Sequence, residues 1–321
     1  MSELFGALLR ANFTASLVVL GVLAVRIPIR RRLGADAAYG LWLAPVAAFL
    51  GSLVPASEAE SDAAAAAARA ALPGWLSGAS GPPDPRLAAA WIAGGLAAGA
   101  MLWIAQGRYM AKARRGEAGP ALVGVLCPRI VTPRNYETLF SPGERSLIRA
   151  HERAHMDRGD ARVNALLSAL QCLCWFNPIV HLAAHLARQD QEIACDAAVM
   201  RRRPAERRLY AETMLKTQVS RQGLPLGCHW AARGAHPLEA RIRHLKQAPP
   251  DEARRTTGAG LVALLALLGA GGAWAAKPPA PPHAMFIPSC MLPDNQGPHT
   301  SVILITIPAG AKLDAAHLRS A

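Results

Sequence analysis

Residues 141–155 read SPGERSLIRAHERAH, and this stretch decides how the middle of the chain is interpreted. It opens with Ser141, Pro142 and, three residues after the serine, Glu144. This spacing is a capping box with proline at the first helical position, so it predicts a helix that begins here. Gly159 is a suitable residue at which the helix ends, because glycine favours the C-terminal cap.

The same helix carries the motif His-Glu-x-x-His at positions 151–155. Residues four apart lie on one face of a helix, so the imidazoles of His151 and His155 can reach one metal ion. Glu152 lies beside them and can take a proton from a water that zinc activates. The pattern is typical of a zinc hydrolase, but so short a motif also arises by chance on a solvated helix.

A second helix is expected to begin at Asn177-Pro178, a good cap followed by a good first residue, and to run to about Met200. A catalytic zinc keeps three protein ligands, and Glu192 on this helix is a suitable third ligand. Asp196, one turn later, can accept a proton from a ligand histidine and fix its tautomer. The open alternative is that both acids belong to an ordinary solvated face.

Two further histidines, His181 and His185, are also four residues apart on this second helix. They lack an adjacent glutamate, so they do not repeat the hydrolase pattern. His185 is considered as a residue near the cleft, but a structural or interfacial role is the favoured interpretation for both.

Four apolar stretches are long enough to cross a membrane as helices, which requires about 20 residues. Composition agrees, because 18% of the residues are charged, against about 25% in an average soluble domain. The four stretches comprise residues 12–29, 37–55, 87–106 and 258–276.

Basic residues cluster at the ends of these stretches that would share one side of a membrane. By the positive-inside rule this side is the cytoplasm, so we expect a multi-pass protein of a bacterial inner membrane with its N-terminus outside. The net charge of +13 is explained by such flanks, and no nucleic acid partner is expected. The flanking residues are Arg26, Arg30, Arg31, Arg32, Arg108, Lys112, Arg114, Arg115, Arg254 and Arg255.

The predicted fold is mainly α, with four membrane helices, a cytoplasmic zincin-like metalloprotease domain and a short external C-terminal tail. Residues 301–308 (SVILITIP) in the tail read as one strand, too little to bury a core. The parts are 1–106, with three spans and an external loop at 57–86; 107–255, the protease domain; 256–276, the fourth span; and 277–321, the tail.

Residues 163–176 are apolar enough to suggest a fifth span. If they crossed the membrane, His151 and Glu192 would lie on opposite sides and could not share a metal ion. The stretch is also short, and Asn164 and Gln171 interrupt it. We therefore interpret it as a core helix or as one that dips into the membrane surface.

The order of these features resembles that of the BlaR/MecR-type antirepressor metallopeptidases, a family of membrane gluzincins. The similarity covers about residues 1–250, and its combined order is more specific than the histidine motif alone. It includes three spans followed by residues 124–133 (GVLCPRIVTP), 151–155 (HERAH), 175–178 (WFNP), 190–196 (DQEIACD) and 238–242 (LEARI).

The resemblance implies that zinc is bound by His151, His155 and Glu192, with Glu152 as general base and Asp196 behind the ligands. Family substrates are cytoplasmic transcriptional repressors, and self-cleavage accompanies activation. The expected partners are therefore the lipid bilayer and a protein substrate of this kind, and a homodimer is considered as well.

Sensor members of the family carry a large external penicillin-binding domain with its nucleophile in Ser-x-x-Lys. Residues 277–321 contain no such motif, so direct β-lactam sensing is not expected. Two alternatives stay open: a membrane zinc protease of quality control, and a transmembrane signal transducer without proteolytic activity. The intact His-Glu-x-x-His motif argues against the transducer.

Overall fold

The computed structural model describes residues 2–54, 85–220 and 237–275. The described residues up to Trp274 belong to one compact unit. The strand predicted at 301–308 and nearly all of the predicted external loop at 57–86 lie outside the described residues.

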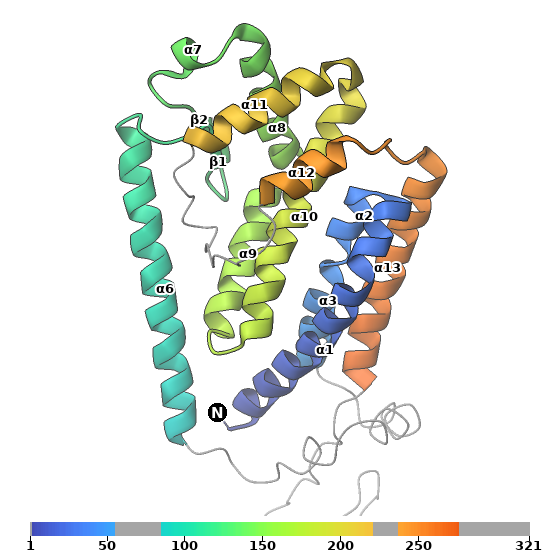
Figure 1. Ribbon diagram of the computed structural model, residues 1–321. Helices are drawn as coiled ribbons and strands as arrows, with labels where there is room; N and C mark the ends of the chain where they lie inside the picture. The colour runs from blue at the N-terminus through green and yellow to red at the C-terminus, as the bar shows by residue number, and fades with distance from the viewer. Residues whose placement is uncertain (1, 55–84, 221–236, 276–321) are drawn as a thin grey trace, which may run out of the picture. The chain divides into compact units, whose positions relative to one another are not determined.

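Helices dominate these ranges, which confirms the mainly α prediction (Figure 1). A two-stranded antiparallel sheet accompanies them, with Leu122 opposite Ile130. The elements in order are α1 (Ser2–Leu33), α2 (Ala35–Gly40), α3 (Leu43–Leu53), α6 (Pro85–Arg114), β1 (Ala121–Val123), β2 (Arg129–Val131), α7 (Tyr136–Leu139), α8 (Pro142–Arg158), α9 (Asp160–Leu173), α10 (Pro178–Arg202), the 3-10 helix η1 (Pro204–Glu206), α11 (Arg207–Ser220), α12 (Pro237–Leu245) and α13 (Glu252–Ala275).

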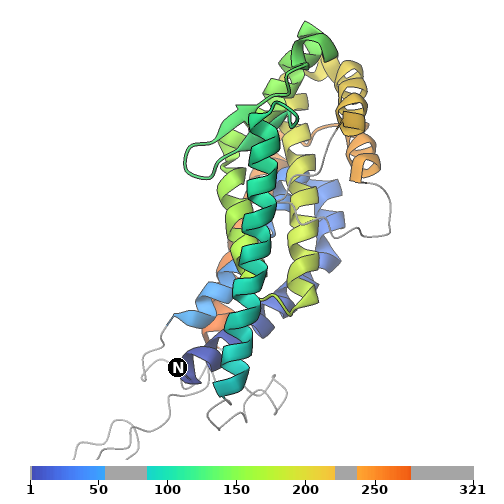
Figure 2. The same cartoon turned by 90° about the vertical axis from the view of Figure 1, so that its left-hand side faces the viewer.

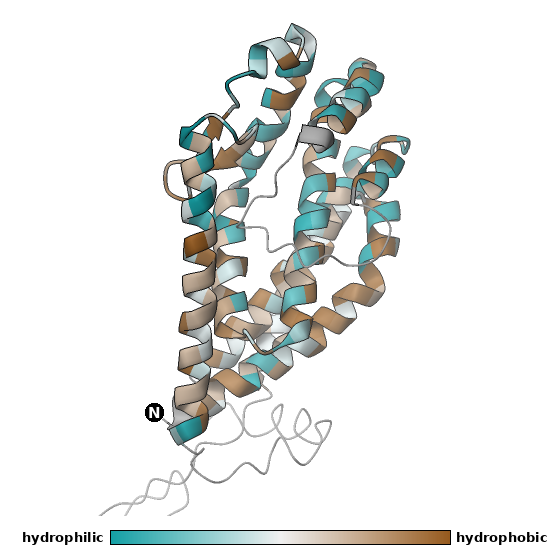
Figure 3. Cartoon of the chain, turned by 60° about the vertical axis from the view of Figure 1, so that its left-hand side comes forward, coloured by the Kyte–Doolittle hydropathy of each residue, from teal (hydrophilic) through white to brown (hydrophobic). Residues whose placement is uncertain are grey.

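Four segments among the described residues are long and apolar enough to cross a membrane, at the places where the sequence predicts them. They comprise Phe5–Leu33, Ala35–Leu53, Pro85–Arg114 and Glu252–Ala275. Apolar residues are prominent along α6 (Figure 3), and both α6 and α13 turn most of their side chains outward. Water would make such exposure costly, whereas lipid tails would not.

The sequence predicts the second apolar segment to be one continuous helix. The structure instead divides it into α2 and α3 at Leu41 and Trp42. Both residues are buried in a core shared with α1 and α10. The Trp42 indole donates a hydrogen bond of 2.9 Å to Asp190. The break therefore coincides with a buried polar contact to α10.

Helix α8 forms as its sequence predicts. The Ser141 hydroxyl accepts a hydrogen bond from the Glu144 backbone, and the Glu144 carboxylate accepts one from the Ser141 backbone. The helix ends at Gly159, whose φ of 70° is in the left-handed region that glycine favours. Helix α10 begins as predicted too, with the Asn177 side chain accepting from the backbone of Ile179 at 2.9 Å.

The apolar run at 163–176 forms most of α9, which packs against α6, α8 and α10. Figure 2 shows α6 running lengthwise in front of these helices. The two polar residues that interrupt the run both find partners: Asn164 donates to Gln191, and Gln171 contacts the ring of His181. These contacts fit the core-helix interpretation of the run.

The hairpin of β1 and β2 falls within a stretch to which the sequence assigned no secondary structure. Gly124 follows β1 with a φ of 100°, and a Cβ atom there would lie 2.6 Å from the carbonyl oxygen of Cys127. Glycine is therefore required at this turn. Glycine and proline at the ends of a short apolar run were the signal for the hairpin.

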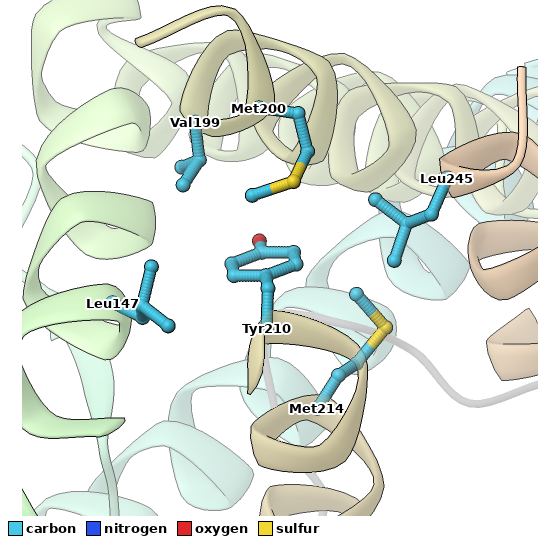
Figure 4. Close-up of a cluster of buried hydrophobic side chains, with 6 residues drawn as sticks. All are labelled: Leu147, Val199, Met200, Tyr210, Met214 and Leu245. Atoms are coloured by element: carbon cyan, nitrogen blue, oxygen red, sulfur yellow. The ribbon is translucent and has the colours of Figure 1, made fainter. Parts of the chain in front are cut away.

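Helix α10 lies at the centre of the packing, since it contacts α1, α2, α8, α9 and α12. One buried cluster joins it to α8, α11 and α12, with the ring of Tyr210 in its middle (Figure 4). The cluster consists of Leu147, Val199, Met200, Tyr210, Met214 and Leu245. It holds α10 rigidly beside α8, which carries the histidine motif.

Candidate metal centre

Helices α8 and α10 bring His151, His155 and Glu192 together. The Nε2 atoms of the two histidines lie 3.1 Å apart. Each also lies 3.5 Å from a different carboxylate oxygen of Glu192. Both histidines are buried, so three potential ligand atoms converge on one point inside the protein.

These separations suit a tetrahedral ion. Ligand bonds of about 2.0–2.1 Å, as zinc forms, place neighbouring ligand atoms about 3.3 Å apart. Glu192 Oε2 is buried and has no hydrogen bond of good geometry among the described residues, although Arg241 lies close to it. A cation among these atoms would satisfy this oxygen and both imidazole nitrogens, so the residues present fit such an ion.

The far side of His151 is held by Tyr210 and Asp196. His151 Nδ1 lies 2.8 Å from the Tyr210 hydroxyl and 3.3 Å from Asp196 Oδ1. The Tyr210 hydroxyl donates to Asp196 at 2.7 Å, so its oxygen is available to accept from His151. The network assigns the ring proton to Nδ1 and leaves Nε2 free for a metal ion.

The far side of His155 is held by Asp160, the first residue of α9. His155 Nδ1 lies 2.7 Å from Asp160 Oδ2, and only 1% of Asp160 is exposed. The Cys195 sulfur lies 3.2 Å from the same nitrogen. His155, Asp160 and Cys195 form another group with metal-binding atom types, but the hydrogen bonds of His155 and of the Cys195 thiol with Asp160 Oδ2, at 2.7 and 3.3 Å, account for their proximity.

Arg241, from α12, links two acids of α10, Glu192 and Asp196. Its guanidinium lies 2.7 Å from Glu192 Oε2 and donates to both oxygens of Asp196, at 2.6 and 2.7 Å. Burial would raise the pKa values of Glu192 and Asp196, but the arginine charge holds both well below their usual range. Both acids are therefore charged in the folded protein.

The site favours positive charge. Burial would lower the pKa of His151, but the nearby carboxylates of Asp196 and Glu192 raise it to about 9. Burial and the nearby Asp196 charge raise the pKa of Tyr210, so its hydroxyl stays protonated and can donate. The field that favours a proton on His151 would also favour a bound metal cation.

Glu152 is 4% exposed and lies beside His151 on a cleft of about 380 Å³. The cleft is lined by residues of α8, α11 and α12 and by one residue before β1. These residues are Pro120, Ile148, His151, Glu152, Tyr210, Thr213, Met214, Thr217 and Arg241. The Glu152 carboxylate and one side of the candidate metal centre therefore line the same cleft.

Several of these contacts are not predicted from the sequence. Tyr210 and Asp160 belong to no recognisable motif, and Arg241 belongs only to the LEARI segment of the family resemblance. His181, by contrast, contacts the carbonyl oxygen of Trp175 at 2.9 Å, which fits the structural role expected for it. In the described part of the chain, neither His181 nor His185 belongs to a group that could hold a metal ion.

Comparison with known proteins finds a family for the middle of the chain. Residues 113–245 match the family described as BlaR1 peptidase M56. The chain is 35% identical over 98 residues to the regulatory protein BlaR1 of Bacillus licheniformis, which covers 30% of this chain and 16% of that protein. No solved structure matches the chain.

Residues 113–245 therefore form a domain of the BlaR1-type M56 peptidase family, and the resemblance seen in the sequence is confirmed over this protease region. The family consists of membrane-associated metallopeptidases that act in signalling. The chain spans only 16% of the length of its BlaR1 relative.

The ion pairs of Arg241 generate a prediction about stability. Replacing Arg241 with methionine leaves the charges of Glu192 and Asp196 buried without their cation. We expect the metal-free protein to lose about 3 kcal/mol of unfolding free energy. Denaturant unfolding in detergent, followed by tryptophan fluorescence, measures this loss.

The matched control is Arg243→Met on the same helix. Arg243 is 73% exposed in its side chain and pairs only with Glu239 in the described structure, so its loss should change stability by less than about 0.5 kcal/mol. Equal effects of the two substitutions would contradict the buried network.

Proposed function

We propose that this chain is a membrane-anchored zinc endopeptidase, with zinc held by His151, His155 and Glu192. The observation that carries the proposal is the convergence of two buried Nε2 atoms and one carboxylate within 3.1–3.5 Å. When bound, zinc supplies the Lewis acidity that activates water and polarises a peptide carbonyl. Membership of a metallopeptidase family supports this chemistry.

Four side chains besides the proposed ligands take part in the proposed reaction. Glu152, on the cleft next to His151, takes a proton from the attacking water and later gives it to the leaving amine. Asp160 and the pair of Tyr210 and Asp196 hold the imidazole rings so that their Nε2 atoms face the ion. Little rearrangement of the ligands is then needed when a substrate binds.

The proposed substrate is a cytoplasmic transcriptional repressor, with cleavage of the chain itself as a second activity. Support comes from the domain shared with a relative named as a regulatory protein. A housekeeping protease of membrane quality control is the alternative, and a single preferred substrate would argue against it. A homodimer remains a prediction from the sequence.

The role of Glu152 provides the test of proteolysis. Glu152→Gln removes the base but no proposed ligand, so we expect one zinc per chain and a rate of peptide cleavage at least about 100-fold lower. The full-length protein in detergent is incubated with a library of peptides from a digested bacterial proteome, and new termini are counted by mass spectrometry.

Glu137→Gln is the control for this experiment, since the Glu137 carboxylate is 85% exposed and pairs only with Arg145 in the described structure. Its rate should equal that of the unaltered protein. Cleavage retained in Glu152→Gln would remove Glu152 from the mechanism, and no cleavage by the zinc-loaded unaltered protein would contradict proteolysis.

We also propose that residues 107–255 face the cytoplasm and that the tail at 277–321 lies outside. Two native cysteines report on these parts, the exposed Cys127 and, in the tail, Cys290. In variants that retain one cysteine each, a membrane-impermeant maleimide should label Cys290 in intact spheroplasts. It should label Cys127 only after the membrane is disrupted, and the reverse pattern would invert the topology.

A further inference from the structure

The short helix α2 packs directly against the part of α10 that carries Glu192. Ala35 of α2 shares a buried core with Ile193 and Ala194, and Tyr39 packs against the same core. Ala35 is 3% exposed, while Ile193 and Ala194 are 1% and 0% exposed. The beginning of the second apolar segment thus packs against the two residues that follow the proposed ligand Glu192.

Tyr39 reaches further, into the hydrogen bonds behind His155. Its hydroxyl donates to Asp160 Oδ1 at 3.1 Å. The other oxygen of Asp160 is the one that lies 2.7 Å from His155 Nδ1. One buried carboxylate therefore joins a tyrosine of the second apolar segment to a proposed zinc ligand.

The direction of the Tyr39 hydroxyl is set by Gln191. The amide of Gln191 donates to the Tyr39 oxygen at 2.8 Å, so the tyrosine proton is left to point toward Asp160. Asn164 in turn donates to the Gln191 oxygen at 3.1 Å, which fixes the amide. Gln191 is 2% exposed, so water does not replace these partners.

The ring of Tyr39 is held as well as its hydroxyl. The guanidinium of Arg158 lies 4.7 Å from the ring centroid. Arg158 also pairs with Asp36 of α2 at 2.8 Å, and Arg201 of α10 pairs with the other oxygen of Asp36 at the same distance. Helix α2 is therefore clamped between the ends of α8 and α10.

We propose that Tyr39 is a positioning residue of the metal centre, which acts through Asp160 on His155. The inference rests on the proposed function, because it presumes that His155 is a zinc ligand. Asp160 holds the imidazole best when the proton of Tyr39 satisfies its second oxygen. The metal centre then depends on a residue of the second apolar segment, and not on residues 107–255 alone.

The experiment compares the zinc affinity of the full-length protein and of Tyr39→Phe in detergent, by competition with a fluorescent chelator. Phenylalanine keeps the ring against Arg158 and removes only the hydroxyl. We expect the dissociation constant for zinc to rise about 10-fold, the lower end of the effect of losing a partner behind a metal ligand.

Tyr136→Phe is the matched control. It removes one tyrosine hydroxyl whose hydrogen bond, at 3.3 Å, goes to the backbone oxygen of Arg145 and not to a proposed ligand or its partner. Its zinc affinity should be unchanged. The unfolding midpoints of both metal-free variants are measured in parallel, and zinc is titrated where both variants are folded, because loss of the buried Tyr39 hydroxyl also lowers the free energy of unfolding.

The route through Asp160 is tested in the Asp160→Asn background. There, Tyr39→Phe should weaken zinc binding by no more than about 2-fold, because the two residues act in series. A full 10-fold effect in both backgrounds would overturn the route. If the unaltered protein binds zinc and Tyr39→Phe binds it equally well, this inference fails while the proposed function stands. If the unaltered protein binds no zinc, the proposed function itself fails.

Discussion

Two imidazole nitrogens that face each other at 3.1 Å inside a protein place a strong constraint on everything around them. Their Nδ1 atoms are held by Tyr210 and Asp160, so both Nε2 atoms present lone pairs to the same point. Such an arrangement is unfavourable unless a proton or a metal cation lies between them. The negatively charged carboxylate of Glu192, 3.5 Å from each Nε2 atom, further favours a positive charge at this point.

Helix α10 meets this constraint because several other helices pack around it. Three acids of this helix, Asp190, Glu192 and Asp196, point toward three different groups of partners. Asp190 pairs with Arg26 and Arg30 of α1, at 2.9 and 3.0 Å. Glu192 faces the histidines, and Asp196 binds the arginine of α12. Buried charges of this kind are costly unless each has its partner, so α1, α8 and α12 must all be in place around α10.

Local signals explain what could be predicted from the sequence. The cap at Ser141, the end at Gly159 and the start at Asn177 depend on residues within one turn of each other, and the spans depend on composition. The contacts that were missed join distant residues: Tyr39 and Asp160 are 121 residues apart, and Arg241 and Asp196 are 45 apart. No local sequence pattern predicts such pairs. The break of the second apolar segment at Trp42 could not be predicted for the same reason, since the hydrogen-bond partner of Trp42, Asp190, is 148 residues away.

The central claim is that one zinc ion is bound by two histidines of α8 and a glutamate of α10. The most direct test is the zinc content of the full-length protein purified in detergent, compared with His155→Ala, Glu192→Ala and the control His181→Ala. We predict one zinc per chain in the unaltered protein and in the control, and loss or marked weakening of binding in the other two. Absence of zinc from the unaltered protein, or binding indifferent to Glu192→Ala, would contradict the account.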